Sequence, residues 1–240
     1  MAPTLRVMQR RCRTITYTLC GDIGSGRAFD PALGFDNYIR QLDEVLLKAG
    51  IQSASLCGVS YGGVIALRYA ALRAMRVTSL ILVSTPGPGW TPNDTQQQYV
   101  AHPWLSAPAF IATAPRRLWP EISAACPVWR QRLAFSAAYS ARVLAAPAVP
   151  SRMAARIALQ QGLDLAADCA RIAAPTLVLT GEDDLDHIVP PHFTREYQRL
   201  IPGARYEKIE NTGHIGILTR PGRFTDIVSR FVNECLPSQI

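Results

Sequence analysis

Short apolar runs alternate with segments of helical periodicity along most of the chain. The runs are nearly continuous, as is typical of strands buried on both faces of a parallel sheet. We expect strands at 53–57, 77–83, 175–181 and 205–209, and helices at 35–49, 61–74, 191–200 and 221–235. This alternation predicts an α/β fold with a mostly parallel sheet flanked by helices.

The N-terminal part adds a short helix and one further strand to this pattern. Residues 2–11 predict the helix, and the alternation of residues 13–19 is typical of a β-strand. A glycine-rich loop follows at 21–26. A phosphate cradle is disfavoured there, because no Gly-Lys-Ser/Thr is present and the glycine spacing is the reverse of the dinucleotide fingerprint.

Residues 86–170 differ in composition from both flanks. They are rich in Pro and Ala, contain no obvious strand, and have helical patterns that we expect to break at several prolines. All four tryptophans fall in this segment, at Trp90, Trp104, Trp119 and Trp129. We expect a helical segment whose small core is packed by tryptophan side chains, with some aromatic residues lining an apolar pocket.

A Gly-x-Ser-x-Gly motif stands between the strand at 53–57 and the helix at 61–74. Its fixed members are Gly58, Ser60 and Gly62. A serine at the apex of such a turn has strained backbone angles, and the glycines let the strand and the helix pass closely. Ser60 is therefore the candidate nucleophile.

With this motif on an alternating α/β chain, the sequence resembles the α/β-hydrolase family over most of its length. The resemblance implies a Ser-His-acid triad with Ser60 as the nucleophile, and it implies the backbone N–H of Tyr61 as one oxyanion donor. It also implies three segments: a core formed by 1–85 and 171–240, and an inserted helical cap at 86–170.

The resemblance points to His214 as the general base. The family carries its catalytic histidine in a loop after a late strand, behind a glycine, and Gly213-His214 follows the predicted strand at 205–209 in that way. A neutral imidazole beside the serine would accept its proton.

Two carboxylates compete for the role of the acid. Counted from the end of the strand at 175–181, the family pattern Gly-x-x-Asp selects Asp184. Counted back from the next helix, the pattern Asp-x-apolar-apolar-Pro selects Asp186. We favour Asp186, because the Ile-Val-Pro segment packs and fixes what precedes it, and we expect Glu182 and Asp183 to be solvated.

One section of the family pattern has no counterpart. The segment at 13–19 matches the fourth strand of the family, so the first three strands, and the loop that supplies the second oxyanion donor, are absent from the sequence. The predicted strands at 13–19 and 53–57 would each expose an unpaired edge. We expect either that the natural product extends upstream of Met1, which we favour, or that the chain is a truncated form.

Composition bounds the class of protein. With 48% hydrophobic and 18% charged residues among 240, we expect a globular protein with a substantial core. No apolar run reaches the roughly 18 residues that span a bilayer, and no secretory signal is recognised, so we expect a cytoplasmic protein without a membrane partner. The net charge of +7 comes from scattered arginines, which disfavours a nucleic-acid partner.

The cysteines add no further candidate site. The six cysteines lack metal-ligand spacing, so we expect buried free thiols, no metal and no cofactor.

Taken together, the sequence predicts a serine hydrolase that cleaves an ester, thioester, lactone or carbon–carbon bond of a small apolar molecule through an acyl-enzyme. Ser60 argues against dehalogenase and epoxide-hydrolase activity, because relatives with those activities carry Asp at the elbow. The alternative is a hydrolase-like binding protein, or a fragment without a full oxyanion hole. The sequence indicates neither the substrate nor the oligomeric state.

Overall fold

The computed structural model describes residues 2–145 and 149–236. The chain divides into two units. We call them the sheet unit, made of Met1–Thr16, Asp43–Trp90 and Asp164–Ile240, and the helical unit, made of Tyr17–Leu42 and Thr91–Leu163. The helical unit overlaps the predicted cap at 86–170, but it also contains Tyr17–Leu42, which we had assigned to the core.

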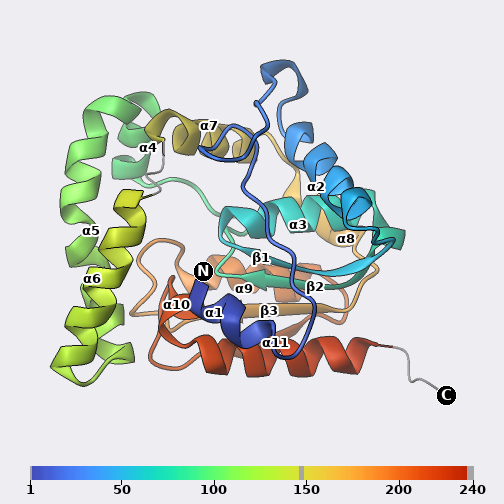
Figure 1. The fold of residues 1–240 in the computed structure, drawn as a ribbon. Helices are drawn as coiled ribbons and strands as arrows, with labels where there is room; N and C mark the ends of the chain where they lie inside the picture. Colours follow the sequence, from blue (N-terminus) through green and yellow to red (C-terminus); the bar gives the residue numbers. More distant parts are fainter. Residues whose placement is uncertain (1, 146–148, 237–240) are drawn as a thin grey trace. The chain divides into compact units, whose positions relative to one another are not determined.

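Four parallel strands form the sheet, in the order β1-β2-β3-β4 (Figure 1). Their bounds are β1 (Ala54–Val59), β2 (Val77–Val83), β3 (Thr176–Thr180) and β4 (Arg205–Lys208). All four were predicted, β1 to β3 from their apolar runs, whereas β4 has a mixed sequence with no buried residue. Among the described residues β1 pairs only with β2, so it forms an edge of the sheet, as predicted for the strand at 53–57.

Helices lie on both faces of this sheet (Figure 1). On one face α3 (Tyr61–Leu72) contacts β1 and β2, and α9 (Pro191–Leu200) contacts β3 and β4, with α8 (Leu165–Ala170) touching both helices. On the other face lies α11 (Pro221–Cys235), with α1 (Ala2–Met8) against it. The shorter elements are η1 (Pro31–Leu33), η2 (Ala74–Arg76) and α10 (Gly216–Thr219), and α2 (Asp36–Lys48) spans the division between the units.

Alternate residues of the central strands supply the core beneath α11. Ile81 and Val83 of β2 and Leu177 and Leu179 of β3 are buried there. They pack with Phe224, Ile227, Val228 and Phe231 of α11, and with Ile209 and Ile217. The same strands are buried on their other face as well, which explains the uninterrupted apolar runs 80–83 of β2 and 177–179 of β3.

The predicted strand at 13–19 is wrong, because residues 13–19 form no strand. Alternation stabilises a strand when one face is buried and the backbone has a ladder partner. Here Ile15 is 39% exposed, and the Arg13 guanidinium donates to the Ala49 carbonyl at 3.1 Å instead of a ladder forming. The alternating apolar side chains of this segment are therefore not buried as those of a strand would be.

The helical unit contains α4 (Asp94–Ala101), α5 (Pro103–Ala125), α6 (Trp129–Ala145) and α7 (Pro150–Gln161). One cluster of its buried apolar residues contains Tyr99, Ala107 and Ala154, with Met153 packed against them. The predicted helix breaks are wrong within α5, which continues through Pro108, Pro115 and Pro120. A proline removes one N–H and bends a helix without always ending it.

The predicted burial of tryptophans and cysteines holds only in part. Trp90 is buried, but Trp104, Trp119 and Trp129 are exposed, so they do not pack the core of the helical unit. All six cysteines are free, and only Cys20 and Cys169 are buried. The positions of the tryptophans and cysteines in the sequence did not indicate whether their side chains face the core or solvent.

Candidate active site

Ser60 occupies the sharp turn between β1 and α3. Its φ of 52° and ψ of −125° are unusual for a residue with a side chain and are a form of local backbone strain. The turn is held by two hydrogen bonds: the Ser60 N–H donates to the Val83 carbonyl at 2.8 Å, and the Ser60 carbonyl accepts from the Gly63 N–H at 2.8 Å. The strain persists because neighbouring elements fix the backbone on both sides.

The glycines around Ser60 are not equivalent. A Cβ on Gly58 would lie 2.3 Å from the Gly62 carbonyl oxygen, so Gly58 is required for the strand and the helix to pass. A Cβ on Gly63 would lie 1.9 Å from Oγ1 of Thr85, whereas one on Gly62 would meet nothing within 4 Å. Sequence reasoning identified Gly58 but missed Gly63, because the motif does not reveal what packs against the first turn of α3.

Asp186 lies in the loop after β3, and its two carboxylate oxygens have different partners. Oδ1 accepts from the backbone N–H groups of Ile188 at 3.0 Å and Val189 at 2.9 Å. Oδ2 lies 3.2 Å from Nδ1 of His214. The Asp186 side chain is only 1% exposed. The carboxylate therefore holds its own loop and the histidine ring together.

The structure does not bring the other acids of this loop to His214 in the same way. Asp184 is exposed, and Asp183 is also exposed, with an ion pair to Arg195. Glu182 is only partly exposed, contrary to the expectation that it is solvated. Its Oε1 accepts from the Asn211 N–H at 2.9 Å, which ties the loop after β3 to the loop after β4.

Backbone contacts bring these two loops close together. The Glu182 N–H donates to the Thr212 carbonyl at 2.8 Å. A Cβ on Gly181 would lie 2.3 Å from the Thr212 carbonyl oxygen, and one on Gly213 would lie 2.3 Å from the Leu185 carbonyl oxygen. A side chain at the position before His214 would therefore clash with the neighbouring loop, and the close packing of the two backbones sets the position of the histidine.

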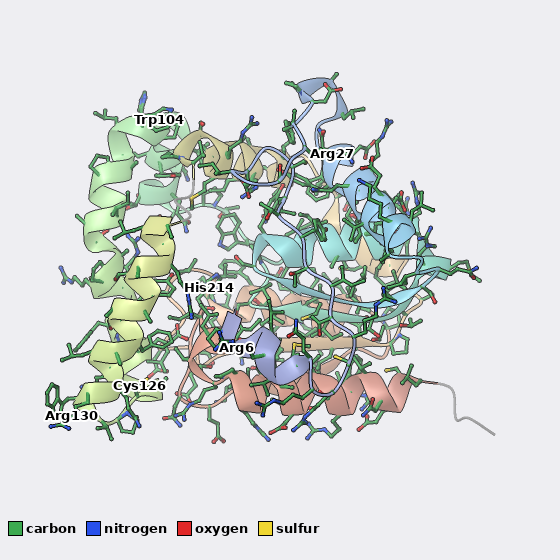
Figure 2. The ribbon with its side chains drawn as sticks, in the orientation of Figure 1. Arg6, Arg27, Trp104, Cys126, Arg130 and His214 are labelled. Atoms are coloured by element: carbon green, nitrogen blue, oxygen red, sulfur yellow. The ribbon has the colours of Figure 1, made fainter. Side chains whose placement is uncertain are left out.

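Ser60, Asp186 and His214 follow the carboxyl ends of β1, β3 and β4. Because the strands are parallel, the loops at these ends leave one edge of the sheet, where open α/β sheets bind their ligands. The backbone hydrogen bonds continue past the strand ends, from Ser84 N–H to the Leu179 carbonyl and from Ile209 N–H to the Thr180 carbonyl. Figure 2 shows His214 at this end of the sheet.

The chemical capacity of the arrangement follows from the hydrogen bond at Nδ1. Bonding of Nδ1 to a carboxylate favours the tautomer with the proton on Nδ1, which leaves Nε2 to accept a proton. Tyr61 begins α3, and N–H groups in the first turn of a helix point out of its N-terminus, where they stabilise negative charge. Among the described residues no group of three or more His, Cys, Asp or Glu side chains forms a metal site.

Comparison with known proteins agrees with this fold. The model of the alpha/beta hydrolase family matches residues 3–227, and the chain belongs to that family. It is an enzyme of the hydrolase class, since it belongs to this family and two of its matched relatives are named hydrolases. The family membership that the elbow motif suggested is confirmed.

Relatives with different named activities match over similar lengths. The chain is 29% identical to the epoxide hydrolase EphH of Mycobacterium tuberculosis over 225 residues, which cover 84% of this chain and 94% of that protein. It is 26% identical to a putative carbamate hydrolase RutD of Azorhizobium caulinodans over 239 residues, or 97% and 85% of the two chains. The enol-lactonase of Burkholderia xenovorans LB400 has a similar fold, with a TM-score of 0.76, 20% identity, and coverage of 97% and 85%.

Proposed function

We propose that this protein is a serine hydrolase that cleaves an ester-like bond of a small apolar molecule. Ser60 is the nucleophile, His214 the general base and Asp186 the residue that orients the histidine. The observation that carries the proposal is the 3.2 Å contact between Asp186 Oδ2 and His214 Nδ1, in loops at the same sheet edge as the strained Ser60. Asp184, the other candidate acid, is not part of this proposal.

The reaction proceeds in two stages. Nε2 of His214 takes the proton of the Ser60 hydroxyl as Oγ attacks the carbonyl carbon, and then gives it to the leaving group, which leaves an acyl-enzyme. Water activated by the same nitrogen releases the acid and restores the serine. The Tyr61 N–H stabilises the oxyanion in both stages, a contribution of about 10²–10³ in turnover for a typical donor.

The serine also bears on the choice among the relatives' activities. Attack of a carboxylate on an epoxide carbon gives an ester intermediate, which water can hydrolyse. Attack of a serine on the same carbon would give an ether, which water does not hydrolyse under these conditions. The side chain at position 60 therefore favours acyl chemistry over epoxide opening. Esters, thioesters, lactones and carbamates share the carbonyl that this mechanism needs, and a carbon–carbon bond beside a carbonyl is cleaved by the same group of residues.

The test combines turnover with covalent labelling. The full chain is assayed on a panel of aryl and alkyl esters, thioesters and lactones, with an epoxide as comparison, and is treated with a fluorophosphonate probe. We expect ester turnover and labelling at Ser60, both removed by Ser60→Ala, with kcat lower by about 10⁶-fold. Ser53→Ala, at an exposed serine just before β1, is the matched control and keeps both.

Two results would contradict the proposal. Folded protein that turns over no carbonyl substrate and takes no label at Ser60, yet binds a small ligand, would favour a hydrolase-like binding protein. Hydrolysis of the epoxide that survives Ser60→Ala would place the chemistry on another residue.

A further inference from the structure

The helices α5 and α6 of the helical unit run antiparallel beside each other and form what we call the α5–α6 hairpin (Figure 1). A helix of a globular protein normally buries its apolar stripe and exposes its polar face. In α6 none of the described side chains is buried. The apolar residues of this hairpin therefore face solvent to an unusual extent.

The exposed apolar residues of α5 share one side of the helix. At 3.6 residues per turn, Trp104, Leu105, Ile111 and Trp119 fall within an arc of about 120°. Trp104 is 66% exposed and Leu105 is 82% exposed. Of the buried residues of α5, Ala107 and Leu118 lie outside that arc, whereas Ile122, near the end of the helix, lies within it. The exposed apolar residues thus share one side of α5 between Trp104 and Trp119.

A second stripe runs along α6. Trp129, Leu133 and Leu144 fall within an arc of about 60°, and Trp129 is 62% and Leu144 79% exposed. Arg130 neighbours this stripe, with its guanidinium carbon 5.5 Å from the centre of the Trp129 ring. Figure 2 shows Arg130 at the tip of the hairpin, near Cys126, pointing away from the helices.

The exposed charged side chains of the hairpin are all arginines. Between Pro103 and Ala145 there are five arginines and a single acid, Glu121, which is 1% exposed. Arg116, Arg130 and Arg142 are exposed. Arg116 and Arg130 border the two stripes, whereas Arg142 lies on the opposite side of α6 from its stripe. An apolar stripe with tryptophan and arginine at its border suits the interface of a lipid bilayer, where indole rings lie at the headgroup level and arginines meet anionic lipids.

We propose that the α5–α6 hairpin is a docking surface for an anionic lipid membrane. A second copy of the hairpin is a poorer occupant, because it would bring arginines against arginines with no exposed acid between them. The contact is peripheral, since no helix in the described part of the chain is long and apolar enough to cross a bilayer. The expectation of no membrane partner rested on the absence of a spanning segment, which surface binding does not require.

The experiment measures partitioning of the full chain onto vesicles. Sedimentation with phosphatidylcholine vesicles that contain 30% phosphatidylglycerol, about the anionic fraction that attracts basic segments, is compared with sedimentation on phosphatidylcholine alone. We expect binding to the anionic vesicles only, weaker at high salt, with a blue shift of tryptophan emission. The double variant Arg116→Gln/Arg130→Gln should bind about 25-fold more weakly, at about fivefold per arginine.

A charge-matched variant separates the hairpin from net charge. Arg40→Gln/Arg199→Gln removes two exposed arginines outside the hairpin and should bind as the unchanged protein does. Trp104→Ser/Trp129→Ser should also bind at least tenfold more weakly while the circular dichroism and the ester turnover stay unchanged. Because Ser60, Asp186 and His214 lie in the sheet unit, vesicle binding and catalysis are tested separately.

Several outcomes would overturn the proposal. They are an absence of binding to the anionic vesicles, equal binding to neutral and anionic vesicles, and an equal loss of binding in the two arginine variants. A dimer in light scattering that Trp104→Ser/Trp129→Ser dissociates would show that a second copy covers the hairpin. Capture of an acidic protein with no affinity for lipid would assign the surface to a protein partner.

Discussion

The loops at the carboxyl edge of the sheet and the α5–α6 hairpin are built on opposite principles. In the loops, glycines allow backbone segments to approach each other directly, and the carboxyl side chain of Asp186 is almost fully buried. In the hairpin, tryptophan and leucine side chains face solvent. The glycines and Asp186 of the first region leave little freedom for substitution, and the second region leaves much of its surface without a partner inside its own unit. Fixed geometry suits chemistry, whereas an uncovered apolar surface suits association.

The largest effect is expected where the loops act on the reaction. Asp186→Asn keeps the shape of the side chain but weakens its hold on the tautomer of His214, so kcat should fall by about 10⁴-fold. Asp184→Asn is the matched control, because Asp184 is exposed two residues away, and it should change kcat less than twofold. Steady-state kinetics on one ester checks both. Equal retention of activity in the two variants would refute the proposed triad.

A large effect on stability is expected at the first turn of α3. In Gly63→Ala the new Cβ would overlap the side chain of Thr85, and we expect a loss of about 3 kcal/mol in the free energy of unfolding. Gly62→Ala adds the same atom into open space in the same helix and should be neutral, or stabilising by up to about 1 kcal/mol. Urea unfolding compares them. If the two variants are equally stable, the contact with Thr85 does not constrain the turn.

A smaller effect is expected from the link between the two loops. Glu182→Ala removes the acceptor for the Asn211 N–H, and kcat/KM should fall about tenfold through misplacement of His214. Glu182→Gln keeps an acceptor oxygen and should restore most of the activity. Asp183→Ala, which breaks only an exposed ion pair with Arg195, should change little. Failure of Gln to rescue would mean that Glu182 acts through its charge.

The smallest effect is expected in the hairpin. Leu133→Ser replaces an exposed side chain of α6 and should change the free energy of unfolding by no more than about 0.5 kcal/mol. Phe224→Ala, in the core beneath α11, should cost about 3–5 kcal/mol. Thermal and urea unfolding report both values. A loss at Leu133 comparable to that at Phe224 would mean that the hairpin is covered in the native protein.

Much of the sheet unit could be predicted from the sequence because its signals are local. The apolar runs predicted β1 to β3, and the elbow motif predicted the turn at Ser60. Asp186 lies 3.2 Å from His214, whereas Asp184 is exposed, and the catalytic role of Asp186 stays a prediction. Asp186 accepts from the N–H groups of Ile188 and Val189, so the segment after it does fix its position.

The remaining features depend on contacts between distant parts of the chain. The sequence around residues 13–19 alternates like a strand, but only a neighbouring strand could have made it one. Gly63 and Glu182 are explained by Thr85 and Asn211, whose proximity no local pattern encodes. The number of tryptophans was evident, but the side of the helix on which each lies was not. The catalytic assignment, the cap and the cytoplasmic location stay predictions.

The two carboxylate oxygens of Asp186 have different partners, and this limits which side chains could replace it. One carboxylate closes a turn with Oδ1 and holds the histidine with Oδ2. A glutamate would carry an extra methylene and could not keep both distances, and an acid placed on another strand would leave the N–H groups of Ile188 and Val189, the second of them buried, without an acceptor. Under the proposed triad, a single replacement of Asp186 would therefore affect both the fold of its loop and the turnover.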